Sequence, residues 1–140
     1  MSRLVVDASV WVSAIDPADR FHETGDAFLD ALIRRRVQIV LPSIARLEVS
    51  CALARIYRDP MRARHLSEAY LSPPFRKDFA MTEAFIEAAI ATGTERKLRA
   101  GDALYAALAV SAGLPLVAWD QEIIERADAI TPRQWLDDGS

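Results

Sequence analysis

Carboxylates at four positions of the chain are placed where they could hold a metal ion. Asp7 and Asp120 each follow a short apolar run that predicts a strand, and Asp102 follows a glycine at a predicted helix start. Glu48 lies within a predicted helix, and its neighbours at i±3 and i±4 are apolar, so its side chain should face the protein. The four positions are therefore candidates for one shared site.

Clustered carboxylates repel one another unless a proton or a cation neutralises them. Mg²⁺ suits such a cluster because it takes oxygen ligands and prefers a few carboxylates together with waters. A bound ion of this kind makes a water nucleophilic near neutral pH and orients it toward a phosphate. The acidic set thus predicts phosphodiester hydrolysis without a covalent intermediate.

Each carboxylate also has an ordinary structural interpretation. The two strand-end aspartates would serve equally well as N-caps of the helices that follow, and Asp102 would be favoured by the dipole of its own helix. Glu48 would form an ion pair with Arg46 or Arg55. A shared site is preferred because strand-end and helix-start carboxylates can converge on one edge of a parallel sheet.

Strands and helices alternate along the sequence. Apolar runs predict strands at 3–6, 37–41, 75–79 and 115–119. Apolar spacing and capping residues predict helices at 8–15, 19–36, 42–57, 60–71, 83–91, 102–112 and 121–127, followed from Thr131 by a tail that is irregular or a single turn. This order predicts an α/β fold with a parallel sheet, helices on both faces and a ligand site at the carboxyl ends of the strands.

The length and charge of the chain limit the classes of function. At 140 residues the chain should fold as one domain, residues 1–140. Its net charge of −3 disfavours a broad basic surface for duplex DNA. A nucleic-acid enzyme is consistent with that charge, since acidic metal ligands themselves make the sum negative.

The single cysteine and the apolar runs bear on the compartment. Cys51 cannot form an intrachain disulfide and lies in an apolar helical pattern, which predicts a buried thiol. No stretch approaches the roughly 18 apolar residues of a membrane helix. We therefore expect a cytoplasmic protein that does not span a membrane.

Four short motifs follow one another across nearly the whole chain. They are LVVDAS at 4–9, LEV at 47–49, GDALYAA at 101–107 and LVAWD at 116–120. Together they resemble the PIN domain family, most closely its stand-alone VapC-type toxins. The resemblance implies a three-layer α/β/α fold with a parallel sheet of about five strands. It also implies an endoribonuclease that depends on Mg²⁺ or Mn²⁺, whose catalytic residues and metal ligands are Asp7, Glu48, Asp102 and Asp120.

Two further positions are interpreted from the same resemblance. It places a supporting hydroxyl on Ser9, which would otherwise make a local bond to the backbone. Members of the family often carry Thr two residues before the last aspartate, where this chain has Ala118. We therefore expect Asp120 to be held differently and to support a ligand through water.

The resemblance also implies partners. They are an RNA substrate, a cognate antitoxin whose tail covers the active site, and a second copy of the chain in a homodimer. RNA phosphates need basic side chains, and the preferred set leads directly into Asp102: Arg96, Lys97 and Arg99. The basic clusters at 34–36 and 55–64 are the other candidates, and each cluster could equally be a solvated face.

Two other functions stay open at this point. A PIN-type nuclease of RNA maturation would share the site but not the toxin role. A catalytically silent domain would bind RNA or a protein, and Ala118 leaves that interpretation open. A phosphotransfer enzyme is disfavoured, because no second acid follows Asp7 at Ser9 and no G-x-x-x-x-G-K loop occurs.

Overall fold

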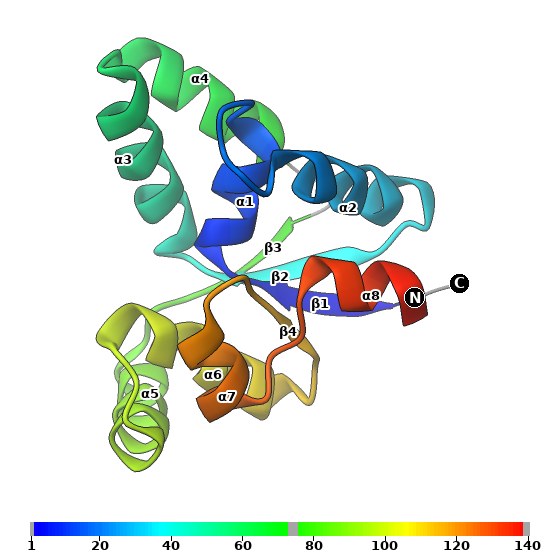
Figure 1. Cartoon of the computed structure of the whole chain (residues 1–140). Coiled ribbons are helices and arrows are strands. Elements are labelled where there is room, and N and C mark those ends of the chain that lie inside the picture. Colours follow the sequence, from blue (N-terminus) through cyan, green and yellow to red (C-terminus); the bar gives the residue numbers. More distant parts are fainter. Residues whose placement is uncertain (1, 73–75, 139–140) are drawn as a thin grey trace.

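Four parallel strands form the central sheet in a computed structural model that describes residues 2–72 and 76–138 (Figure 1). They are β1 (Arg3–Val6), β2 (Gln38–Pro42), β3 (Arg76–Phe79) and β4 (Leu116–Val117), in the spatial order β3-β2-β1-β4. The register places Val5 of β1 opposite Val40 of β2 on one side and Leu116 of β4 on the other. The first and last strands of the chain are therefore neighbours.

The sheet has four strands within the described residues, so the expectation of about five is wrong in this detail. The place of a fifth strand is taken by Ile130, which makes a single parallel bridge to Val117. The chain cannot extend that pairing, because Pro132 has no N–H and begins the next helix. The strand predicted at 115–119 is shorter than expected, since β4 contains only Leu116 and Val117. The strand predicted at 75–79 is β3, and its first predicted residue, 75, lies outside the described residues.

Helices cover both faces of the sheet, which confirms the three-layer α/β/α fold (Figure 1). On one face lie α1 (Ala8–Ile15), α2 (His22–Arg34), α3 (Ala45–Tyr57) and α4 (Pro60–Tyr70). On the other lie α5 (Glu83–Arg96), α6 (Ala100–Ala112) and α7 (Gln121–Ala127). A last helix, α8 (Pro132–Asp138), packs against α2, where the rings of Phe28 and Trp135 meet edge to face at 5.2 Å.

The core is built from the apolar strands and from one nearly all-apolar helix. Val5, Ile39 and Val117 have no exposed surface. Residues 103–109 of α6 are all buried, because this helix lies directly on β1, β2 and β4. Continuous apolar strands are typical of a parallel sheet covered on both faces. This packing fixes where α6 begins, and hence where Asp102 lies.

The predicted end of one helix and the predicted form of the tail are wrong, and both differences have a physical cause. The helix predicted to close at Gly93 continues to Arg96, and Lys97 takes the left-handed cap with φ of 57°. Gly93 is instead a contact point, since a Cβ there would lie 2.7 Å from the Cβ of Ala103 on α6. The tail, predicted to be irregular or a single turn, forms α8, because Thr131 caps its first turn by accepting the N–H of Gln134.

Cys51 is exposed, so the prediction of a buried thiol is wrong. The buried stripe of α3 is narrow and runs through Ala45, Val49 and Leu53, one residue per turn. Cys51 lies on another side of the helix.

Within residues 2–72 and 76–138, every helix is too short or too polar to cross a bilayer.

The close approach of α5 and α6 gives the first testable prediction. We expect Gly93→Ala to destabilise the fold by about 1–3 kcal/mol, because the added methyl group overpacks the helix contact. The sign of this change in the free energy of unfolding distinguishes the two effects, since alanine normally stabilises a helix interior relative to glycine by about 1 kcal/mol. Urea unfolding measures the change, and adding Ala103→Gly should restore part of the loss. A Gly93→Ala variant as stable as the wild type would contradict the assigned contact.

Candidate active site

The carboxyl ends of β1 and β4 mark the candidate site. The backbone N–H of Asp7 donates to the carbonyl of Val117 at 2.9 Å, so these two ends lie side by side. The chain leaves β1 through α1 on one face of the sheet and leaves β4 through α7 on the other (Figure 1). Parallel sheets bind their ligands at such a switch in chain direction.

Asp7 is buried at this point and held by its neighbour. It caps α1, and its Oδ2 accepts both the N–H of Ser9 at 3.1 Å and the hydroxyl of Ser9 at 2.6 Å. Only 7% of Asp7 is exposed. Burial raises the pKa of the Asp7 carboxyl, while the bonds from Ser9 lower it and the charge of Asp120 raises it further. Asp7 is thus an N-cap, and it is also a buried carboxylate beside a second negative charge.

Glu48 reaches the same edge of the sheet from α3. The hydroxyl of Tyr105, a residue of α6 that is 1% exposed, donates to Glu48 Oε1 at 2.7 Å. The structure therefore pairs Glu48 with Tyr105 rather than with Arg46 or Arg55. Burial raises the pKa of Glu48, the bond from Tyr105 lowers it, and the charge of Asp7 raises it.

Asp102 and Asp120 complete the acidic group. Asp102 lies in the first turn of α6, and its pKa is raised from 3.8 to about 6, chiefly by burial and also by the charges of Asp7 and Asp120. The positive charge of Arg99 acts in the opposite direction. Asp120 is exposed and caps α7, where its Oδ1 accepts the N–H of Glu122 at 2.8 Å. Residues from four separate segments thus interact electrostatically at one edge of the sheet.

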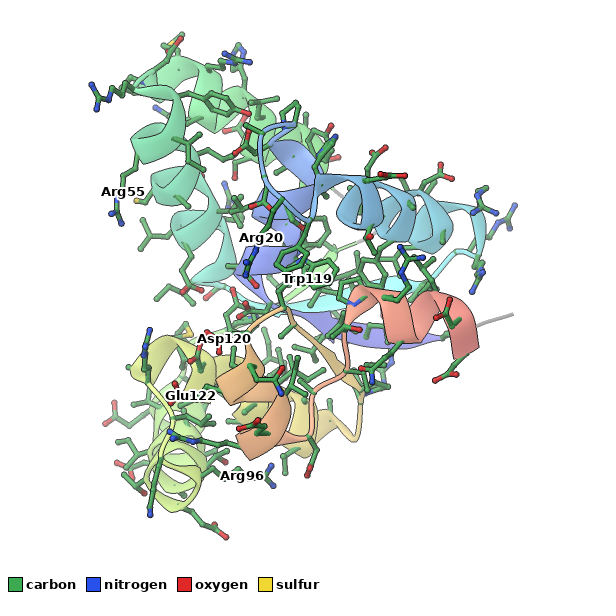
Figure 2. All side chains as sticks on the ribbon, viewed as in Figure 1. Arg20, Arg55, Arg96, Trp119, Asp120 and Glu122 are labelled. Atoms are coloured by element: carbon green, nitrogen blue, oxygen red, sulfur yellow. The ribbon has the colours of Figure 1, made fainter. Side chains whose placement is uncertain are left out.

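Trp119 fixes the segment that leads to Asp120. Its ring stacks on Phe21 with centroids 4.2 Å apart, and its indole N–H donates to the hydroxyl of buried Ser13 at 2.9 Å. Arg20 lies over the Phe21 ring at 4.5 Å, and Figure 2 shows Arg20, Trp119 and Asp120 close together at this edge. Ala118 has no exposed surface. The anchor for Asp120 is therefore the packing of Trp119 and the α7 cap.

The three predicted RNA contacts lie in different surroundings. Arg99 is exposed, precedes α6 and lies close enough to Asp102 to influence its pKa. Lys97 is also exposed. Arg96 is half-buried and lies 3.9 Å from Asp128, and in Figure 2 it points away from Asp120. Arg99 is thus the basic residue of this set that the structure brings to the acidic group.

Several residues at the site were missed by the sequence analysis. Tyr105 lies one turn after Gly101 on α6, and that spacing beside Asp102 was an available signal. Glu122 lies two residues after Asp120, adds to the negative charge around Asp102 and is paired with Arg126. Arg20 lies in a loop far from any motif and gave no signal in the sequence.

The donor set fits a hard divalent cation, although it forms no ready-made cage. Among the described residues, no three Asp, Glu, His or Cys side chains lie close enough to hold an ion by themselves. Mg²⁺ needs only one or two protein carboxylates, because waters and substrate phosphates complete its shell. The negative charges around Asp102 repel one another, and a cation relieves that repulsion. All the donors are carboxylates, which suit Mg²⁺ or Mn²⁺.

The family model of the PIN domain matches residues 4–129 of the chain. The chain belongs to the PIN domain family. No curated protein is similar enough in sequence to count as a relative of this PIN domain.

Solved structures show the same fold. PAE2754 from Pyrobaculum aerophilum superposes with a TM-score of 0.75 and 23% identity, over 98% of this PIN domain and 94% of that chain. VapBC2 from Rickettsia felis, bound to a DNA fragment from its promoter, superposes with a TM-score of 0.70 and 15% identity, over 92% of this PIN domain and 96% of that chain. VapC20 from Mycobacterium tuberculosis, a sarcin–ricin loop cleaving toxin, superposes with a TM-score of 0.67 and 21% identity, over 84% of this PIN domain and 90% of that chain.

The raised pKa of Asp102 makes the stability of the metal-free PIN domain depend on pH. Because its pKa rises from 3.8 to about 6 on folding, the folded state holds this proton more tightly than the unfolded chain does. The resulting stabilisation is complete below pH about 4 and is lost as the pH rises through about 6. We expect Asp102→Asn to remove this loss, so that the variant melts above the wild type at pH 7 in the presence of a chelator.

Melting temperatures measured between acid and neutral pH check this expectation. Asp26→Asn, at an exposed position of α2, is the matched control and should follow the wild type throughout. Parallel curves for the wild type and Asp102→Asn would contradict the proposed electrostatic coupling.

Proposed function

We propose that this PIN domain, predicted to be a single domain over residues 1–140, is a metal-dependent endoribonuclease and the toxin of a toxin–antitoxin pair. The observation that carries the proposal is the proximity of carboxylates from different segments at the switch point of the sheet, where the charge of Asp7 raises the pKa of both Glu48 and Asp102. Separate helix caps would not need to lie within reach of one another. A site for a cation that binds a phosphate explains the clustering.

Mg²⁺ or Mn²⁺ would be held chiefly by Asp7 and Asp102. Glu48 and Asp120 would contribute directly or through water, since the side chains do not converge into a complete cage. When bound, the ion supplies positive charge to the phosphate and makes a water nucleophilic near neutral pH. In the hydrolysis, the water oxygen would form a bond to phosphorus as the ester P–O bond to the ribose oxygen breaks, and a proton lost by the water would end on that ribose oxygen.

The side chains around these carboxylates would prepare the site. The Ser9 hydroxyl holds one oxygen of Asp7, so the orientation of that carboxylate is fixed before a ligand arrives. Trp119 fixes the backbone before Asp120 through its stacking and its bond to Ser13. Arg99 supplies a positive charge at the edge of the site, where an RNA phosphate would approach.

The role as a toxin rests on the structural neighbours. VapC20 is described as a sarcin–ricin loop cleaving toxin, and VapBC2 was solved bound to a DNA fragment from its promoter. A structure described as a toxin–antitoxin complex from Klebsiella pneumoniae also shares the fold, with a TM-score of 0.66. By analogy we propose a cognate antitoxin as the protein partner, RNA as the substrate, a homodimer as the assembly and the cytoplasm as the compartment.

Induced expression tests the nuclease and the toxin role together. We expect the wild type to arrest growth and to generate new RNA ends at defined positions, whereas Asp7→Asn and Asp102→Asn do neither. The purified wild type should cleave RNA with Mg²⁺ or Mn²⁺ and stop when a chelator is added. From the usual share of metal chemistry in such reactions, the loss in kcat for each variant should be about 100-fold or more.

The Asp26→Asn variant controls for the loss of a negative charge away from the site, and it should behave as the wild type. RNA cleavage without growth arrest would favour a nuclease of RNA maturation. Intact RNA in a broad panel with either ion would overturn the nuclease proposal and favour a silent binding domain.

The position of Arg99 gives a prediction about RNA binding. We expect Arg99→Gln to weaken RNA binding and to make the slope of log K against log salt shallower by about 0.7, the value for one lost phosphate contact on a single strand. Arg34→Gln is the matched control, because Arg34 is exposed on α2 and already paired with Asp30 at 2.9 Å. A larger loss in the Arg34 variant would place the RNA on the cluster at 34–36 instead.

A further inference from the structure

The bond between Tyr105 and Glu48 joins the two helical layers at the acidic group. Glu48 belongs to α3 on one face of the sheet, and Tyr105 belongs to α6 on the other (Figure 1). The Tyr105 hydroxyl donates to Oε1 of Glu48 at 2.7 Å. The tyrosine is 1% exposed, whereas Glu48 is half-buried, so the bond links a buried hydroxyl to a carboxylate at the edge of the core. A phenyl ring would fill nearly the same space, and only the hydroxyl needs the carboxylate.

Gly101 lies against the other oxygen of the same carboxylate. It precedes Tyr105 by four residues, so both lie on one face of α6. A Cβ at position 101 would stand 3.2 Å from Glu48 Oε2, closer than ordinary van der Waals contact. One face of α6 thus presents a hydroxyl to one oxygen of Glu48 and a bare backbone to the other.

The carboxylates of the group differ in how they are anchored. Asp7 is held by Ser9, two residues away, and Asp120 is held by a backbone N–H of its own helix. Glu48 has the longest side chain and the most rotamer freedom to lose. Its anchor comes from a residue 57 positions away in the chain. Nothing in its own helix replaces the bond from Tyr105.

We propose that Tyr105 and Gly101 are positioning residues that set the orientation of the Glu48 carboxylate toward Asp7 and Asp102. This inference rests on the proposed function of the acidic group as a metal-dependent nuclease site. The hydroxyl restrains one oxygen of Glu48, and the missing side chain at 101 leaves room for the other. The ion and the RNA then meet a carboxylate whose direction is already set.

Tyr105→Phe is the first test. Partners that orient metal ligands typically contribute about 10- to 100-fold in metal affinity or activity. We expect kcat to fall within that range, KM for RNA to stay near the wild-type value, and the affinity for Mn²⁺ alone, measured by calorimetry, to fall. Tyr57→Phe is the matched control, because its hydroxyl lies 3.4 Å from Asp16 and takes no part in the acidic group. That control should leave kcat and Mn²⁺ affinity unchanged.

A double-mutant cycle with Glu48→Ala decides whether Tyr105 acts through Glu48. If it does, Tyr105→Phe has little further effect on Mn²⁺ affinity once Glu48 is truncated. Gly101→Ala is an independent test that does not remove the buried hydroxyl. Alanine favours a helix over glycine, so this variant should melt at or above the wild-type temperature and still lose kcat and Mn²⁺ affinity.

Two results would overturn the positioning role: additive effects in the cycle, or wild-type kcat and Mn²⁺ affinity in both Tyr105→Phe and Gly101→Ala. If the wild type is active in the same experiments, the proposed nuclease function still holds. A wild type that neither binds Mn²⁺ nor cleaves RNA would overturn the proposed function, and the positioning role with it. A loss in Gly101→Ala that is accompanied by a lower melting temperature would point to a structural defect and would also count against positioning.

Discussion

The repulsion among carboxylates at the edge of the sheet is the constraint on which the rest of the site depends. Asp7 is buried beside Asp120, and Asp102 is subject to both of their charges. Such an arrangement opposes folding unless protons or cations neutralise it. The hydrophobic core must therefore stabilise the fold against a group of like charges that it holds in place. The largely apolar strands β1, β2 and β4, together with α6, provide much of that core.

The fold places the acidic group by bringing opposite ends of the chain together. The pairing of β1 with β4 sets Asp7 beside the segment that carries Asp120, and α6 lies on both strands and presents Asp102 at the same edge. Glu48 arrives from the opposite layer and is held by Tyr105. The site is thus shared between the two helical layers, and each layer supplies acidic residues to it.

The sequence predicted the layers, the order of the helices and strands and the sheet edge at which the four acids lie, because parallel strands and amphipathic helices leave a periodic signal. The predictions were wrong where one residue type is compatible with two different structural roles. Gly93 was interpreted as a helix end, but it is a packing contact inside α5. Cys51 lies in a run of apolar residues, but the buried stripe of α3 is narrower than that run. The partner of Glu48 could not be predicted, because the contact with Tyr105 depends on how α3 and α6 meet across the sheet edge.

The pairing of the first strand with the last also affects when the site can form during synthesis. Contacts between residues far apart in sequence form late, because a long loop must close before they stabilise the chain. Val5 cannot pair with Leu116 until the chain has been synthesised beyond residue 116. A nascent chain that ends before that point lacks Asp120 and the strand β4 that places this residue beside Asp7. The four carboxylates can therefore come together only after the segment that carries Asp120 has been synthesised.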